Sequence, residues 1–247
     1  MALLLTRPLL DSKKTKSILE KYGYKVHIEP MFKIKYLETK LAQDFDVIVS
    51  TSSNSIRALS KISQKRNYPI ITVGNSTMKI AKELGFANVA SANGNVSDLI
   101  LYIKEHYSQD LKFLYVRGKE ISFNLKKALT DKGITVEEAI LYESIDREKL
   151  TKRCKEFLLA DLIREALFFS ARTAKIFCSL VEKSNLLDHI RNTTAYSMSE
   201  KITENLAHYR WKNIITSNQP TQESMLNCIV KFKKRTLEPV SKFTNLV

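Results

Sequence analysis

One arrangement of strand, turn and helix occurs twice in this chain of 247 residues. Residues 46–59 contain an apolar run, a hydroxyl-rich turn and an amphipathic stretch, and residues 165–177 repeat that order. Residues 71–86 and 195–211 form a second matching pair, because in each a short apolar run ends in a small residue that can begin a helix. A repeated strand-to-helix unit predicts two similar α/β lobes, and two lobes imply a cleft between them.

Alternating strands and helices are predicted over most of the chain, which is long enough for two small domains. Between residues 45 and 133 we expect strands at 47–51, 70–73, 89–90 and 113–116, alternating with helices at 53–63, 75–84, 96–106 and 121–132. A strand at 3–6, a helix at 12–22 that Gly23 ends, and strands at 167–169, 194–198 and 214–216 extend the pattern. Such alternation is typical of parallel sheets with helices on both faces.

Two extended segments interrupt the alternation, at residues 24–37 around Pro30 and at residues 134–146. Proline is excluded from helix interiors and central strands, so we interpret the first segment as a connector and the second as its partner. The expected boundaries are 1–24 plus 147–235 for one discontinuous α/β lobe, 25–39 and 134–146 for the connector strands, 40–133 for the other lobe, and 236–247 for a disordered tail.

The formal net charge of +14 favours a polyanionic partner. Charge alone does not choose among nucleic acid, a membrane surface and a small substrate with several negative groups. The lysines are scattered along solvent-facing helix positions, and the sequence has no RNP motif, zinc finger or basic zipper. We therefore expect a solvated basic surface, with no nucleic-acid partner.

The three cysteines, Cys154, Cys178 and Cys228, are isolated in the sequence, and the four histidines lie far apart. This usage indicates reduced thiols and predicts no metal site, because no short ligand spacing is present. No apolar run reaches the length of a secretory signal or a membrane span, so we expect a soluble cytoplasmic protein with no membrane partner.

Short motifs follow one another along nearly the whole chain. They are Leu5-Thr6-Arg7-Pro8, Val49-Ser50-Thr51-Ser52, Val73-Gly74-Asn75-Ser76-Thr77, Val116-Arg117-Gly118, Lys132-Gly133-Ile134, Leu141-Tyr142-Glu143-Ser144, Phe168-Phe169-Ser170 and Asn218-Gln219-Pro220-Thr221. In order and spacing this set resembles the uroporphyrinogen-III synthase family. The resemblance implies two flavodoxin-like parallel-sheet lobes joined by a two-stranded β-ladder, with the active site in the interdomain cleft.

What the resemblance implies chemically is a lyase that converts hydroxymethylbilane to uroporphyrinogen III in haem biosynthesis, without a cofactor or metal. Loss of the terminal hydroxyl gives an azafulvene, attack by the substituted carbon of ring D gives a spiro intermediate, and rearrangement closes the ring with D inverted. The implied partner is a small linear tetrapyrrole with many carboxylates. The resemblance also allows a transient hand-over of this substrate from the preceding bilane-forming enzyme. We expect a monomer.

Helix N-termini suit such a substrate, because their unpaired N–H groups and positive dipole end attract carboxylates. The expected binding residues at these termini are Thr51, Ser52, Ser53, Asn54, Gly74, Asn75, Ser76, Thr77, Asn95, Gly118, Lys119, Ser170, Ala171, Ser199, Pro220 and Thr221. The alternative is that these small residues only cap helices and form turns.

Tyr142 is the candidate catalytic residue, because a phenol is protonated at neutral pH and can donate to the departing hydroxyl. The resemblance supports this role, since the family's usual candidate is a tyrosine in this connector; the alternative is an ordinary half-buried strand tyrosine. Arg7, Arg117 and Arg172 are candidates for bidentate pairing with substrate carboxylates, although Arg172 fits a solvated first-turn residue equally well.

The second copy of the repeated pattern departs from the family, which often has Gly-Pro-Thr-Thr-Ala where this chain has Ser199-Glu200-Lys201-Ile202-Thr203. We therefore expect side chains of the first copy, at 74–77, to matter more, and the second to contribute backbone N–H groups. A non-catalytic two-lobe protein that binds an anionic ligand stays open as the alternative function.

Overall fold

The computed structural model describes residues 1–237, with side-chain surroundings as far as Ile229, and the chain divides into two compact units. Unit 1 contains Met1–Lys33 and the described residues from Asp146 onward, and unit 2 contains Ile34–Ile145. Among the described residues, no helix has both the length and the apolar character that a membrane crossing requires.

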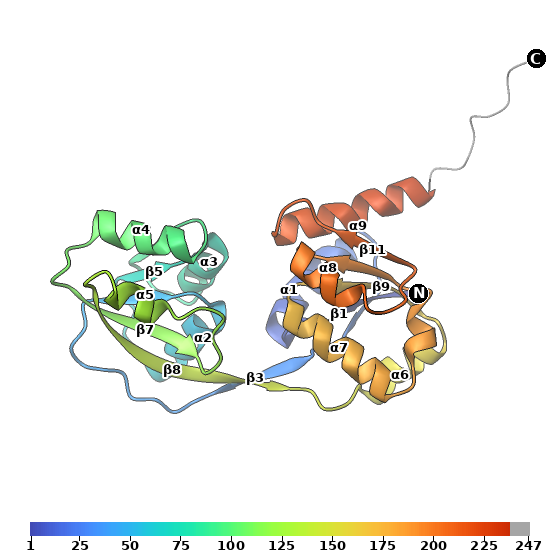
Figure 1. The fold of residues 1–247 in the computed structure, drawn as a ribbon, viewed down its shortest axis with the longest axis horizontal. Coiled ribbons are helices and arrows are strands. Elements are labelled where there is room, and N and C mark those ends of the chain that lie inside the picture. The colour runs from blue at the N-terminus through green and yellow to red at the C-terminus, as the bar shows by residue number, and fades with distance from the viewer. Residues whose placement is uncertain (238–247) are drawn as a thin grey trace, which may run out of the picture. The chain divides into compact units, whose positions relative to one another are not determined.

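Unit 1 is a five-stranded parallel sheet flanked by helices (Figure 1). Its strands lie in the order β2 (Val26–Ile28), β1 (Ala2–Leu5), β9 (Ile163–Phe168), β10 (Thr194–Ser197) and β11 (Asn213–Thr216). Counted along the chain this is 2-1-3-4-5, the order of flavodoxin-like sheets. The order reverses between β1 and β9.

Helices cover both faces of the unit 1 sheet. Their bounds are α1 (Leu9–Lys21), α6 (Lys152–Leu159), α7 (Ala171–Lys183), the 3-10 helix η1 (Leu187–Ile190), α8 (Glu200–Leu206) and α9 (Gln222–Leu237). One face packs against α1 and α9 through Leu19 and Met225, and the other packs against α6, α7 and α8. Gly23 follows α1 at φ 77°, the left-handed conformation that ends the helix as expected.

Unit 2 has a six-stranded sheet in the order β3 (Phe32–Tyr36), β8 (Thr135–Asp146), β7 (Lys112–Gly118), β4 (Val47–Ser50), β5 (Ile70–Thr72) and β6 (Val89–Ser91). The strands from β8 to β6 pair in parallel. When these five strands are numbered in chain order from β4 and listed from β6 to β8, their order in the sheet is 3-2-1-4-5, with β4 at the centre. This order differs from the flavodoxin order, 2-1-3-4-5, that the resemblance implies.

Four helices flank this sheet: α2 (Ser53–Ile62), α3 (Asn75–Glu83), α4 (Val96–His106) and α5 (Leu125–Thr130). Helices α2 and α3 pack on one face of the sheet, whereas α4 and α5 pack on the other. Helix α5 is shorter than the predicted 121–132, because the Asn124 side chain accepts a hydrogen bond from the Lys127 N–H and begins the helix there. Residues 119–124 form a loop instead.

The two predicted connectors are sheet strands. The first divides around Pro30 into β2, an edge strand of the unit 1 sheet, and β3, an edge strand of the unit 2 sheet. The second is β8, which pairs with β7 along seven residues and buries Val136, Ala139 and Leu141. Strands β3 and β8 are neighbours in the unit 2 sheet.

The C-terminal tail that the sequence predicts begins at residue 236. Helix α9 runs past that point to Leu237, and the remaining residues of the predicted tail, 238–247, lie outside the described residues.

Candidate functional site

The candidate site lies at the carboxyl edge of the unit 2 sheet, where strands β4 and β7 are adjacent. The helices that follow them, α2 and α5, leave to opposite faces of the sheet. Ligands of open α/β sheets bind at such a switch point. A cavity of about 270 Å³ opens there, and its lining includes five of the expected site residues: Thr51, Ser52, Arg117, Gly118 and Tyr142.

Tyr142 reaches the start of α2 from β8, and its hydroxyl lies 3.1 Å from the Oγ of Ser52. The ring rests against Gly118, where a Cβ atom would stand only 2.6 Å from the tyrosine Cζ. The register between β7 and β8 is irregular between Arg117 and Gly118, and this places Gly118 opposite Tyr142. A bulge of this kind re-aims a side chain beside a site, and the missing Cβ makes room for the phenol.

Ser52 has two roles at this point. It is the N-cap of α2, where its Oγ accepts a hydrogen bond from the Asn54 N–H at 3.1 Å. Because a serine hydroxyl has one proton and two lone pairs, it can cap the helix and still donate to the Tyr142 oxygen. The helix cap and the candidate catalytic group are therefore linked through one atom.

A second phenol in the cavity, Tyr115, is absent from the expected set. Its hydroxyl lies 3.1 Å from the Oγ1 of Thr51, and the residue is 3% exposed. Burial raises the pKa of Tyr115, and the hydrogen bond with Thr51 offsets part of that effect. The signal was available in the sequence, because Tyr115 stands two residues before Arg117 and strand alternation places both on one face.

Arg117 lines the cavity with its guanidinium already paired. It donates to both carboxylate oxygens of Glu138, at 2.8 and 3.3 Å, and to the backbone oxygens of Gly118 and Lys119. A substrate carboxylate would need the same pair of N–H donors that Arg117 already gives to Glu138. In this structure Arg117 holds the turn after β7, and Glu138 is a partner that sequence reasoning missed because it lay in a presumed connector.

The other helix starts of unit 2 differ in how they are capped. Asn95 and Asp98 form a reciprocal capping box at α4. Ser53 Oγ lies 3.4 Å from Thr77 Oγ1, which brings the starts of α2 and α3 together. At the start of α3, Gly74 is the N-cap without a side-chain bond, and the Asn75 side chain donates to Asn93. Ser76 is exposed in the first turn of that helix. After β7, the Lys119 Nζ lies 3.7 Å from a carboxylate oxygen of Glu143.

The unit 1 candidates lie at the carboxyl edge of their own sheet. Arg7 follows β1, Ser170, Ala171 and Arg172 follow β9, Ser199 follows β10, and Pro220 and Thr221 follow β11. The sequence predicted this gathering, because parallel strands end at the same edge.

Most of these unit 1 side chains have partners within the unit. Arg7 donates to Gln222 at 2.6 Å and lies over the Phe169 ring, and Arg172 donates to Asp146 at 2.7 and 2.9 Å. Ser170 accepts from the Thr173 N–H and Thr221 accepts from the Ser224 N–H, as caps do. Ser199 is the N-cap of α8 without a side-chain cap bond.

A larger cavity of about 570 Å³ lies at the opposite edge of the unit 1 sheet. It is lined by residues at the amino ends of three strands, among them Ala2, Arg164 and Thr194. Parallel sheets bind ligands at their carboxyl edges, and none of the expected site residues lies in this cavity. Size alone is therefore a poor guide here, and the smaller cavity of unit 2 is the candidate site.

Comparisons with known proteins identify the family of the chain. A family model described as uroporphyrinogen-III synthase HemD matches residues 13–227. No curated protein gives a significant match.

Two solved structures share the fold. A uroporphyrinogen-III synthetase from Helicobacter pylori is 18% identical, with a TM-score of 0.64 over 94% of this chain and 99% of that one. A mutant uroporphyrinogen III synthase from the extremely thermophilic bacterium Thermus thermophilus is 16% identical, with a TM-score of 0.54 over 95% of this chain and 100% of that one. The family match spans most of the sequence, and this chain belongs to the uroporphyrinogen-III synthase family.

Proposed function

We propose that this chain catalyses the ring closure of its family, converting hydroxymethylbilane to uroporphyrinogen III with loss of water and inversion of ring D. Family membership over residues 13–227 supports the reaction. The observation that carries the site is the Tyr142 hydroxyl, held by Ser52 in a cavity at the switch point of unit 2.

Tyr142 acts as the proton donor for the departing hydroxyl. The hydroxyl leaves as water when it gains the Tyr142 proton, and the neighbouring pyrrole nitrogen supplies the electron pair that replaces the broken C–O bond. Loss of the pyrrole N–H proton then gives the azafulvene and balances the proton that Tyr142 donates. Because Ser52 accepts the Asn54 N–H, its own proton can go to the phenol oxygen, and this turns the Tyr142 proton into the cavity.

The start of α2 binds a substrate carboxylate near the reacting hydroxymethyl group. Its first N–H groups and the positive end of the helix dipole lie beside the phenol. The side chains of Ser53 and Thr77, in contact across the starts of α2 and α3, offer further hydroxyl donors. A binding site built from N–H and O–H groups holds an anion without needing Arg117, whose fork is occupied by Glu138.

The remaining substrate carboxylates bind to the carboxyl edge of the unit 1 sheet, where Ser170, Ser199 and Thr221 begin helices. In this proposal one substrate molecule contacts both units. We extend the proposal to a monomeric cytoplasmic enzyme that receives its substrate from the bilane-forming enzyme. Gel filtration at micromolar concentration tests the monomer separately from the chemistry.

The reaction is tested by supplying the protein with freshly generated hydroxymethylbilane and separating the oxidised products. Spontaneous closure gives the type I isomer without inversion of ring D. Predominance of type III product supports the proposal. Type I product alone would instead favour a non-catalytic binding protein for an anionic ligand.

A further inference from the structure

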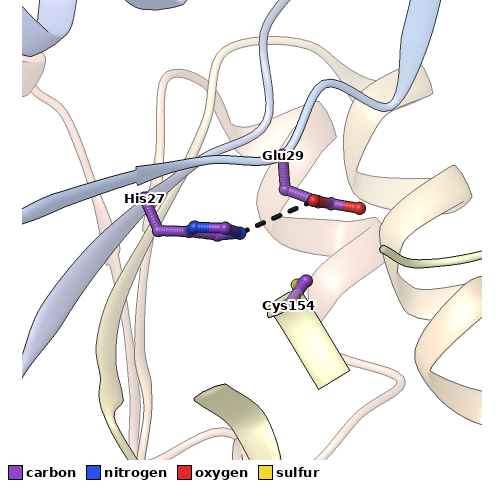
Figure 2. Close-up of side chains that lie close together, drawn as sticks. All are labelled: His27, Glu29 and Cys154. Atoms are coloured by element: carbon purple, nitrogen blue, oxygen red, sulfur yellow. Dashed lines mark ion pairs between the residues drawn. The ribbon is translucent and has the colours of Figure 1, made fainter. Parts of the chain in front are cut away.

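Three side chains with metal-binding atoms meet in the interior of unit 1. His27 lies on β2, Glu29 follows it after one residue, and Cys154 comes from α6; Figure 2 shows the imidazole and the carboxylate reaching toward one another beside the cysteine. One ligand atom from each residue lies within 4.8 Å of the other two. The residues are 9%, 1% and 0% exposed. The cysteine is distant in sequence, so ligand spacing could not reveal this cluster.

The His27 Nε2 atom is buried and makes no hydrogen bond. It lies 3.5 Å from Oε2 of Glu29, an ion pair only when the imidazole is protonated. Nitrogen and oxygen ligands bind zinc at about 2.0–2.1 Å, so in a tetrahedral site they stand about 3.3–3.4 Å apart. The observed separation is close to that value, and a metal ion would satisfy the unpaired nitrogen.

The carboxylate of Glu29 is oriented by its other contacts. Thr151 donates its N–H to Oε1 at 2.8 Å and its hydroxyl to Oε2 at 2.7 Å, and Arg147 lies 3.5 Å from Oε1. Burial alone would raise the pKa of Glu29, but the contacts with His27, Thr151 and Arg147 hold it below its ordinary value. These contacts hold the carboxylate with its Oε2 toward His27, in the way that hydrogen bonds orient a ligating carboxylate.

Cys154 completes the ligand set. Its side chain is fully buried, and binding a metal ion requires the thiol to release its proton. Zinc–sulfur bonds of about 2.3 Å place the sulfur about 3.6 Å from a nitrogen ligand, so Cys154 needs to approach by at most about 1.2 Å. A thiolate and a carboxylate balance the charge of a divalent ion, while Arg147 stays on the other carboxylate oxygen.

A cavity of about 360 Å³ borders the cluster at His27, and its wall also includes Phe157 and Leu162. Lys25 and Arg153 also line this cavity, and their positive charges repel a metal cation. The affinity for the ion therefore has to come from the three ligands themselves.

We propose that His27, Glu29 and Cys154 bind one Zn²⁺ ion in unit 1. Imidazole, thiolate and carboxylate form a donor set typical of zinc. The ion ties the segment after β2 to the start of α6, two parts of the chain that belong to the same unit. This site is separate from the cavity around Tyr142, and its existence does not depend on the proposed function.

The test uses the full-length reduced protein, treated with a chelator and then dialysed against Zn²⁺. Cys154→Ser removes the sulfur ligand, and Cys178→Ser is the matched control because it removes another buried thiol of unit 1. We expect one zinc per chain in the wild type and in Cys178→Ser, and at least tenfold weaker binding in Cys154→Ser. Equal binding by Cys154→Ser and the wild type, or no binding by the wild type, would overturn the proposal.

Cobalt gives a readout that needs no variant. Co²⁺ bound by the wild-type chain should show the near-ultraviolet absorption of thiolate-to-cobalt charge transfer, and the band should disappear when Zn²⁺ is added. Bound Co²⁺ without that band would rule out Cys154 as a ligand even if Cys154→Ser fails to fold.

Discussion

Adding a single methyl group at Gly118 should displace the proposed proton donor. In Gly118→Ala the new Cβ would lie 2.6 Å from Cζ, 2.8 Å from Cε2 and 2.9 Å from the hydroxyl oxygen of Tyr142. Ordinary contact begins at 3.4 Å, so the ring has to move by about 0.8 Å. Such a shift can carry the phenol beyond hydrogen-bond distance of Ser52, from which it now lies 3.1 Å.

The energetic cost should be small and the kinetic cost large. Tyr142 is only partly buried, so the ring can give way, and the main loss is one hydrogen bond of about 1 kcal/mol. Misplacing a catalytic group by about 1 Å can lower the rate about 100-fold. We therefore expect the free energy of unfolding of Gly118→Ala to fall by about 1 kcal/mol and kcat for type III product to fall about 100-fold.

Chemical denaturation and the coupled product assay measure these two quantities. The double variant Gly118→Ala/Tyr142→Ala is the control, because without the ring the added methyl group has nothing to displace. Its rate should match that of Tyr142→Ala alone. Wild-type kinetics in Gly118→Ala, or an equal further loss in both backgrounds, would refute the reasoning.

Two other predictions concern single residues. Ser52→Ala should lower the free energy of unfolding by about 1 kcal/mol, because the helix cap is lost, and should also lower kcat. Ser52→Thr keeps a hydroxyl cap and should have nearly the wild-type stability in thermal melts. Full kcat in Ser52→Ala would show that Ser52 does not position Tyr142. Glu29 has a pKa below its ordinary value of 4.5, so its stabilising contribution is present above about pH 4.5 and is lost as the pH falls through the lower, folded-state value. The stability difference between wild type and Glu29→Gln should therefore shrink in acid unfolding curves measured without added metal, and a difference that grows in acid would contradict the assignment.

Local signals predicted most of the helices and strands. Helix α4 occupies the expected 96–106, because a capping box begins it and apolar spacing continues it. Pairing between distant segments was less predictable. The sequence predicts residues 134–146 as a connector strand, but the local pattern does not show that this strand pairs with β7 inside the unit 2 sheet.

The site was predictable as far as strand ends are predictable. Thr51 and Ser52 follow β4 and Gly118 ends β7, and the sequence pattern predicted that these residues would gather at one edge of the sheet. The partners of those residues were not predictable, because the Arg117–Glu138 pair and the Tyr115–Thr51 contact depend on which strands are neighbours. Strand order is a property of tertiary packing that local pattern does not encode.

The most direct measurement of the central claim is the initial rate of type III product formation by Tyr142→Phe. Tyr102→Phe is the control, because it removes a phenol from α4 outside the cavity lining. Loss of a positioned proton donor is expected to lower kcat about 100-fold or more, with type I product accumulating as spontaneous closure competes, while Tyr102→Phe keeps the wild-type rate. Wild-type turnover to type III product by Tyr142→Phe would show that the hydroxyl leaves without this phenol, and would contradict the account.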